Sequence, residues 1–121
     1  MNITIKATGI DHSDELSALV ESKLLPLQKV LAEQFDRTLC ATEVGQITPR
    51  HASGPTWRAE ATVRVDGKTY RAEAVTESLE SSLDKIESQL NKEIRRAKGR
   101  ERSLFRRGGR AVKSFFRRSG E

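Results

Sequence analysis

Basic side chains are the most concentrated chemical groups in this sequence. Residues 95–121 hold 11 Lys and Arg against two Glu, a net charge of +9, whereas residues 1–94 hold 11 Lys and Arg against 15 Asp and Glu, a net charge of −4. A chain with such a charge split is typical of an interaction arm that binds a polyanion. Phe105, Phe115 and Phe116 lie among the arginines, and aromatic rings beside arginine can stack on unpaired bases.

Nucleophilic catalysis and metal binding need groupings that this sequence lacks. His12 and His51 are isolated, and the single Cys40 gives no metal-ligand spacing. The pair Gly108-Gly109 is flanked by arginines, so it does not match a phosphate-binding loop. Cys40 falls in a predicted strand and is expected to be a small buried apolar group. We therefore expect no enzyme, no cofactor, no metal and no small-molecule substrate.

The N-terminal half predicts a strand, a helix and a second strand. Ile3 and Ile5 alternate with polar residues in a short strand that ends at Gly9, and Ser13 is a predicted helix N-cap. Apolar residues then repeat at helical spacing as far as Leu31. Pro26 lies inside that repeat and should kink or shorten the helix.

Residues 37–47 are predicted to form a second strand, in which either Leu39 and Ala41 or Cys40 and Val44 face inward. Residues 48–56, rich in Pro, Gly and Ser, read as a loop.

A β-hairpin around Asp66-Gly67 is the strongest local signal. This pair favours a type I′ turn, and alternating apolar residues flank it on both sides. A two-residue turn here pairs Val63 with Tyr70 and Ala61 with Ala72, which places the apolar side chains on one face.

The last predicted helix starts near Thr76, because apolar residues from Leu79 to Ala97 follow steps of three and four. The predicted fold is α+β: a two-layer β-α-β-β-β-α unit, with a four-stranded sheet and two helices packed on one face.

The chain is expected to divide into a domain over 1–98 and a disordered basic tail over 99–121. A tail helix would carry Gly108-Gly109, each of which costs about 1 kcal/mol relative to alanine. A short helix with that penalty should not persist alone in water, so the tail is expected to order on a partner.

The cytoplasm is the expected location. The N-terminus lacks the pattern of a signal peptide, there is no apolar run of membrane-spanning length, and a lone cysteine suits a reducing compartment.

Two stretches of the sequence carry a family resemblance. Ser82-Leu83-Asp84-Lys85-Ile86-Glu87-Ser88-Gln89-Leu90-Asn91-Lys92 lies in the last helix, and Ser13-Asp14-Glu15-Leu16 with Glu21-Ser22-Lys23-Leu24 lies in the first. Together with the β-α-β-β-β-α order, they resemble the ribosome hibernation promoting factor and ribosome-associated inhibitor family, also known as the sigma-54 modulation protein family. The resemblance covers about residues 2–98, in a short form with a basic C-terminal tail.

The resemblance implies a bacterial stress-response protein that regulates translation by ribosome hibernation. Such proteins bind the small ribosomal subunit and its rRNA, and they occlude the mRNA and tRNA sites without catalysis. In this chain, Pro26 stands where the family usually has a basic residue, and Ser88 where it usually has arginine. The tail does not resemble the dimerisation domain of the long members, so no ribosome pairing by that route is expected. The rRNA-binding residues expected here, on the helices and in the tail, are Lys23, Lys29, Lys85, Lys92, Arg95, Arg96, Lys98, Arg100, Arg102, Arg106, Arg107, Arg110, Lys113, Arg117 and Arg118.

Two other functions fit the same residues. One is a general RNA-binding or ribosome-assembly protein. The other is a regulator tethered to a partner or to an anionic membrane surface through the basic aromatic tail.

Overall fold

The structure is a computed structural model that describes the backbone of residues 1–47 and 56–119 and the side chains of residues 1–47 and 56–106. The predicted loop over 48–56 therefore lies almost wholly outside the described residues, and so does His51. Along the chain the elements are β1 (Asn2–Thr8), α1 (Asp14–Leu24), α2 (Leu27–Leu31), the 3₁₀ helix η1 (Ala32–Arg37), β2 (Leu39–Ile47), β3 (Thr56–Val65), β4 (Lys68–Thr76) and α3 (Leu79–Ser119).

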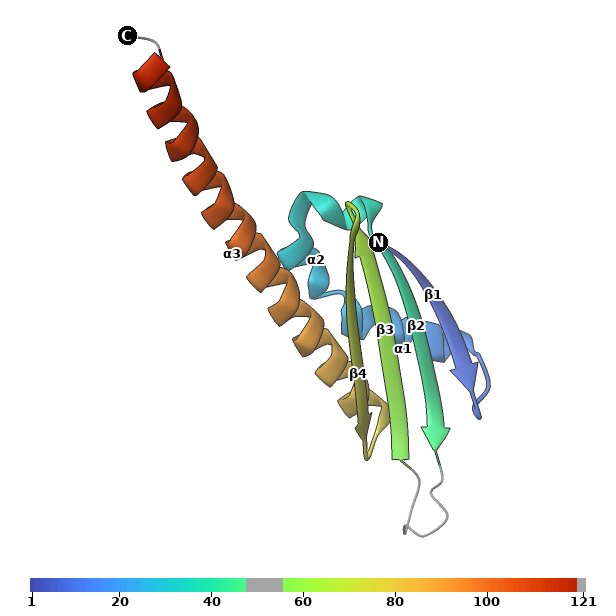
Figure 1. The fold of residues 1–121 in the computed structure, drawn as a ribbon. Coiled ribbons are helices and arrows are strands. Elements are labelled where there is room, and N and C mark those ends of the chain that lie inside the picture. Colours follow the sequence, from blue (N-terminus) through green and yellow to red (C-terminus); the bar gives the residue numbers. More distant parts are fainter. Residues whose placement is uncertain (48–55, 120–121) are drawn as a thin grey trace.

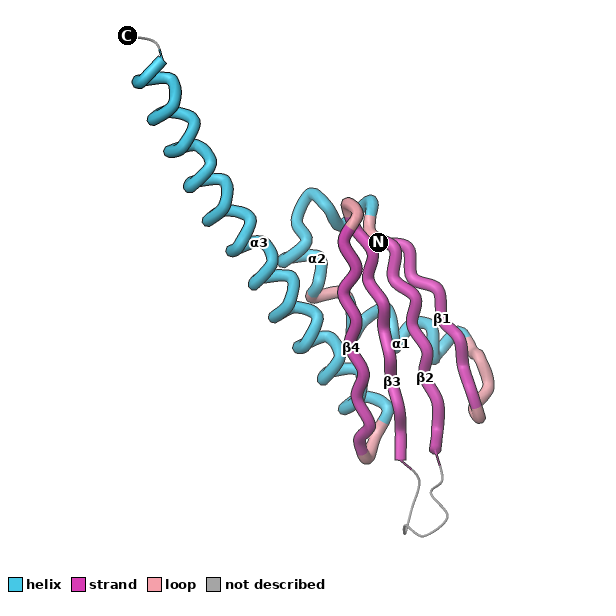
Figure 2. Tube along the Cα trace, in the orientation of Figure 1, coloured by secondary structure: helices cyan, strands magenta, loops and turns pink. Residues whose placement is uncertain are grey.

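The four strands form one sheet in the order β1-β2-β3-β4. β1 pairs with β2 in parallel, and the other two pairs are antiparallel. The helices all lie against one face of this sheet, and none of the described elements covers the opposite face (Figures 1 and 2). The predicted two-layer α+β fold is confirmed.

The β3–β4 hairpin has the register that the sequence predicted. Val63 faces Tyr70 and Ala61 faces Ala72 across the two strands. Asp66 and Gly67 have φ angles of 50° and 77°, the left-handed conformations that a type I′ turn requires. Because of this register, Val63 and Val65 of β3 and the alanines of both strands are buried against the helices, whereas Val75 of β4 lies exposed on the open face.

On β2 the structure resolves which alternation faces inward. Cys40 and Val44 are buried, while Leu39 is 56% exposed on the open face. Both the Leu39/Ala41 pair and the Cys40/Val44 pair are apolar, so composition alone does not show which pair faces the core. The hydrogen-bonded pairing with β3 decides, because it aligns Cys40 with the buried Val63.

Pro26 breaks the first helical segment, as predicted. α1 begins after Ser13, whose Oγ accepts a hydrogen bond from the Leu16 amide at 3.1 Å. It ends at Leu24, and the short α2 begins at Leu27. Proline has no amide hydrogen to continue the helical ladder, which explains the break. The apolar residues Leu24 and Leu27 on either side of it are both fully buried.

α3 contributes Leu83, Ile86, Leu90 and Ile94 to the core, all of them at most 1% exposed. The helix begins at Leu79 rather than near Thr76. Ser78 is its cap, because its Oγ accepts a hydrogen bond from the Ser81 amide at 3.1 Å. Among the described residues, no helix is both long enough and apolar enough to cross a membrane.

Beyond Lys98 the structure differs from the expected disordered tail. α3 continues without interruption through Gly108-Gly109 to Ser119 (Figure 1). The expectation of disorder holds for a separate tail helix, which needs its own nucleus. A continuation of an existing helix avoids the nucleation cost and bears only the propensity cost of the glycines. The division of the chain at residue 98 stays a prediction.

Candidate nucleic-acid interface

The outer face of α3, turned away from the core, carries a row of basic residues with small residues between them. Residues that follow steps of seven, or of three and four, lie on one side of a helix. Lys85, Lys92 and Arg106 follow such steps, and the core residues of α3 lie on the opposite side. We call this surface the basic face and define it by its exposed cations on α3: Lys85, Lys92, Arg95, Arg96, Arg102 and Arg106.

The carboxylates of α3 between Lys85 and Arg106 lie off this line. Glu87 accepts a hydrogen bond from the Asn91 side chain at 3.1 Å, one turn along the flank of the helix. Glu101 forms an ion pair with Lys68 at the start of β4. Glu93 follows Leu90 by three residues and flanks the core stripe on the side near Tyr70, whose pKa is raised chiefly by burial and to a lesser extent by Glu93. The basic face therefore keeps its positive charge although residues 1–94 have net negative charge.

A groove of about 680 Å³ opens between α2 and α3. Four cations line it, one from α2 and three from α3, together with three apolar residues near α2. We call it the α2–α3 groove and define it by Pro26, Lys29, Val30, Ala32, Asn91, Arg95, Lys98, Gly99 and Arg102.

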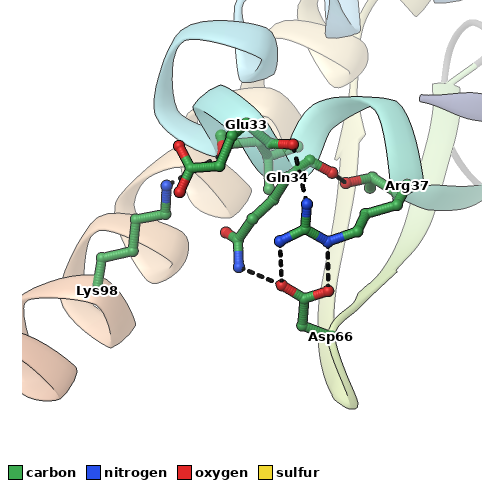
Figure 3. A network of polar contacts seen from close by, with 7 residues as sticks. Glu33, Gln34, Arg37, Asp66 and Lys98 are labelled. Atoms are coloured by element: carbon green, nitrogen blue, oxygen red, sulfur yellow. Dashed lines mark hydrogen bonds and ion pairs between the residues drawn. The ribbon is translucent and has the colours of Figure 1, made fainter.

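Hydrogen bonds hold two of these cations in place. Arg95 Nε donates to Asn91 Oδ1 at 2.8 Å, which fixes the guanidinium along the helix. Lys98 Nζ donates to the Leu31 carbonyl at 3.2 Å, at the end of α2 where carbonyls lack helical partners. Figure 3 shows Lys98 reaching from α3 to this point, with Glu33 close by. Lys98 thus fixes the distance between the two walls of the groove.

Two shallow hollows extend the groove along the basic face. Ser88, Lys92, Arg95 and Arg96 line the first, and Arg96, Gly99, Arg100 and Ser103 line the second. Since Arg95 belongs to both the groove and the first hollow, and Arg96 to both hollows, the three depressions form one continuous cationic surface.

Lys23 lies outside this surface. Its Nζ lies 3.0 Å from Asp84 Oδ1, so the ammonium group is paired with a carboxylate of α3. Its side chain is 29% exposed, and the pair joins the C-terminal end of α1 to the first turns of α3. Lys23 is therefore the one expected cation within residues 1–98 whose charge is paired with a carboxylate in the described structure.

A polar network holds η1, the segment directly after α2. Arg37 contacts both carboxylate oxygens of Asp66, with Nε at 2.7 Å from Oδ1 and Nη2 at 2.8 Å from Oδ2 (Figure 3). Gln34 Nε2 adds a third donor at 2.7 Å. The hydrogen bond from Arg37, followed by the one from Gln34, lowers the pKa of Asp66 to about 2. The network ties the α2–η1 segment to the β3–β4 turn, and no local pattern in the sequence indicates it.

The open face of the sheet differs in charge from the helical side. Glu60 accepts hydrogen bonds from Arg58 at 2.7 Å and Arg71 at 2.6 Å, and Arg58 also contacts Glu73 at 2.9 Å. The Arg71 and Arg58 contacts lower the pKa of Glu60. Glu43, Glu60 and Glu73 are neighbours in register across β2, β3 and β4. Arg58 and Arg71 are thus paired with carboxylates, and only Lys6 and Arg64 remain as exposed cations on this face without an ion-pair partner among the described residues, so the helical side is the better anion-binding surface.

The expected tail residues fall into two groups. Arg100, Arg102 and Arg106 are exposed on the described part of α3, and so are Leu104 and Phe105, at 64% and 83%. For the others the structure describes only the backbone, so their side chains lie outside the described residues: Arg107, Arg110, Lys113, Arg117 and Arg118.

The groups considered for catalysis are not assembled in the described part of the chain. Cys40 is buried, and burial raises the pKa of its thiol, which disfavours the nucleophilic thiolate. No cluster of three or more His, Cys, Asp or Glu able to hold a metal occurs among residues 1–47 and 56–106.

Comparison with known proteins points to one family. Residues 3–102 match the family model described as Sigma 54 modulation protein / S30EA ribosomal protein. No curated protein sequence matches the chain.

Two solved structures share the fold. The N-terminal domain of Protein Y from Thermus thermophilus superimposes with a TM-score of 0.61 and 22% identity, over 79% of this chain and 98% of that one. A ribosomal subunit interface protein from Coxiella burnetii gives 0.61 and 20%, over 82% of this chain and 99% of that one.

Proposed function

Because this chain belongs to the sigma-54 modulation and S30EA ribosomal protein family, we propose that it is a non-enzymatic ribosome-binding inhibitor of translation. In this proposal it works in the bacterial cytoplasm, in the hibernation of idle ribosomes. It docks on rRNA of the small subunit and occludes the sites of mRNA and tRNA. Steric occlusion needs no reacting group, cofactor or small-molecule substrate.

The observation that carries this proposal is the continuity of the basic face with the α2–α3 groove. Arg95 and Arg102 belong to both surfaces, and no carboxylate lines the groove or its two adjoining hollows. Arginine binds phosphate oxygens with two parallel hydrogen bonds, which suits the RNA backbone. The expected rRNA contacts are therefore Lys29, Lys85, Lys92, Arg95, Arg96, Lys98, Arg100, Arg102 and Arg106. We call residues 99–119 of α3 the helical extension, and its remaining basic residues are expected to continue this surface.

Co-sedimentation with purified 30S and 70S particles tests this function. We expect binding at low salt that weakens steeply as salt rises, since each neutralised phosphate releases counterions. We also expect translation to be inhibited in proportion to occupancy, without turnover. If the protein does not bind ribosomes at low salt, the proposal is wrong.

A matched pair of variants locates the surface. R95Q/R102Q removes two cations of the groove, whereas K6Q/R64Q removes two exposed cations from the open face of the sheet. We expect the first variant to weaken ribosome binding about tenfold or more, since each charged contact to phosphate is worth over a kcal/mol. The second should have little effect. Equal losses in both variants would show that only the net charge matters.

A general RNA-binding function is the main alternative. The helical extension favours it, because exposed Arg and Phe on a projecting helix do not require a particular RNA structure. A naked RNA duplex that competes as well as ribosomes would support this alternative.

A membrane-tethered function would use the same extension, where Leu104 and Phe105 lie exposed among arginines. Anionic vesicles that retain the full chain but not residues 1–98 would support it.

A further inference from the structure

We propose that the α2–α3 groove seats a single unstacked nucleotide of a single-stranded RNA segment, with the base against the α2 wall and the flanking phosphates on the α3 wall. The inference rests on the proposed function and deepens it. It assigns one part of the docking surface to an unpaired base rather than to the backbone of a duplex.

The helix break at Pro26 gives the groove its apolar wall. α1 ends at Leu24 and α2 contains only residues 27–31, so the segment from Pro26 to Ala32 lies beside α3 as a separate wall. Pro26 and Val30 are four residues apart, a spacing that places both on the same side of a helical segment. Pro26 is exposed and Val30 is half-buried. Together they form an apolar surface that a planar base can cover.

The opposite wall supplies the charge. Arg95 and Arg102 lie two turns apart on α3, and Lys29 adds a cation beside the apolar residues. Lys98 is engaged with the Leu31 carbonyl and so acts mainly as a spacer between the walls. Three remaining cations around an apolar surface match one nucleotide, which has one base and a phosphate on either side.

The size and the polar groups of the groove narrow the ligand further. Its volume of about 680 Å³ lies in the range of ligand sites, roughly 300–1,000 Å³. Asn91 is the only uncharged polar side chain that lines it, and its amide is occupied by Arg95 and Glu87. The groove therefore offers few polar groups besides its cations to read base edges, and we expect it to discriminate weakly among the four bases. A paired base cannot enter, because its faces are stacked within the duplex.

Gly99 provides a variant that blocks the groove without changing its charge. Gly99 lines the groove, and a Cβ built there meets no atom within 4 Å. Both Gly99→Leu and Gly99→Ala should favour the helix, because glycine is a poor helix former. The leucine side chain is large enough to cover the surface beside Arg95, whereas the methyl group of alanine leaves the groove open. The alanine variant is therefore the matched control.

Short RNA probes measure the contribution of the base separately from that of the phosphates. We would titrate the full chain with an RNA pentamer carrying 2-aminopurine at its centre and with the same pentamer carrying an abasic site. Both have the same charge, so their difference in affinity reports contact with the base. The wild-type protein and Gly99→Ala should prefer the base-containing pentamer by roughly fivefold or more, the scale of one base-stacking contact. Quenching of 2-aminopurine fluorescence should accompany binding. Gly99→Leu should bind both pentamers equally, with an affinity close to that of wild type for the abasic probe.

Three results would overturn the inference. One is equal affinity of the wild-type protein for the two pentamers. Another is a base preference that survives in Gly99→Leu. The third is free adenosine monophosphate binding as tightly as the pentamer, which would reassign the groove to a small molecule. None of these depends on ribosomes. A protein that prefers the base but ignores ribosomes would refute the proposed function alone, and a protein that binds ribosomes without base preference would refute the groove alone.

Discussion

At the scale of single residues, the Asp66 carboxylate shows how a surface charge can hold an element in place. Asp66 accepts hydrogen bonds from Arg37 and Gln34, and these contacts lower its pKa from 3.8 to about 2. A carboxyl group whose pKa is lower in the folded state stabilises the fold above its unfolded pKa. That stability should be lost as the pH falls from about 4 to about 2.

Asp66→Asn tests this contribution. Asparagine tolerates the positive φ of the turn, so the variant removes the charge and leaves the hairpin intact. We expect a lower urea midpoint than wild type at pH 7, and a difference that shrinks toward zero near pH 2. A difference that stays constant from pH 7 to pH 2 would assign the effect to the turn and not to the ionised carboxylate.

The Lys23–Asp84 pair leads to a prediction in which a lost charge strengthens binding. Asp84 holds the Lys23 ammonium at 3.0 Å, and the pair is partly exposed. Asp84→Asn should free Lys23 for phosphate and tighten ribosome binding about two- to fivefold, given that exposed pairs are worth up to about 1 kcal/mol. Glu80→Gln is the control, because it removes a negative charge from the first turn of α3 without touching Lys23. Equal tightening in both variants would indicate a change in net charge only.

At the scale of elements, the sequence predicted the helices and strands that are determined by neighbouring residues in the chain. The hairpin register follows from Asp66-Gly67 and the alternation around it, and the end of α1 follows from Pro26. The groove could not be predicted in this way. Lys29 and Arg95 are far apart in the sequence, and only the packing of α2 against α3 brings them to one surface. Pro26 was the one sequence feature that indicated the groove, since a break in one helix leaves part of the neighbouring helix uncovered.

The extension of α3 was predicted to be disordered because the cost of its two glycines was applied to an isolated helix. In the structure these glycines continue a helix that already exists. Replacing Gly108 and Gly109 together by alanine should stabilise the extension by about 2 kcal/mol. Amide exchange over residues 102–119 should slow, while the global unfolding midpoint stays unchanged, since Leu104 and Phe105 are exposed and make no core contact. A raised global midpoint would show that the extension is coupled to the core.

At the scale of the whole molecule, the body and the extension are expected to contribute separately. A chain ending at Glu101 keeps the Lys68–Glu101 ion pair and the Lys98 contact, so it should unfold at the same urea concentration as the full chain. It lacks seven cations: Arg102, Arg106, Arg107, Arg110, Lys113, Arg117 and Arg118. If all seven contact phosphate, the slope of log affinity against log salt should become shallower by about five. An unchanged slope would mean that the extension does not contact RNA.

The straightness of α3 has a consequence for how the protein meets its target. The cations from Lys85 to Arg118 spread over about 50 Å of helix axis, several times the screening length of about 8 Å in physiological salt. The negative charge of the body therefore cannot cancel the field at the far end (Figure 1). The charge distribution gives the molecule an electric dipole along α3, and we expect a strongly anionic particle to turn it C-terminus first before contact forms. In the proposed function, the residues that arrive first would then differ from the groove residues that fix the bound position.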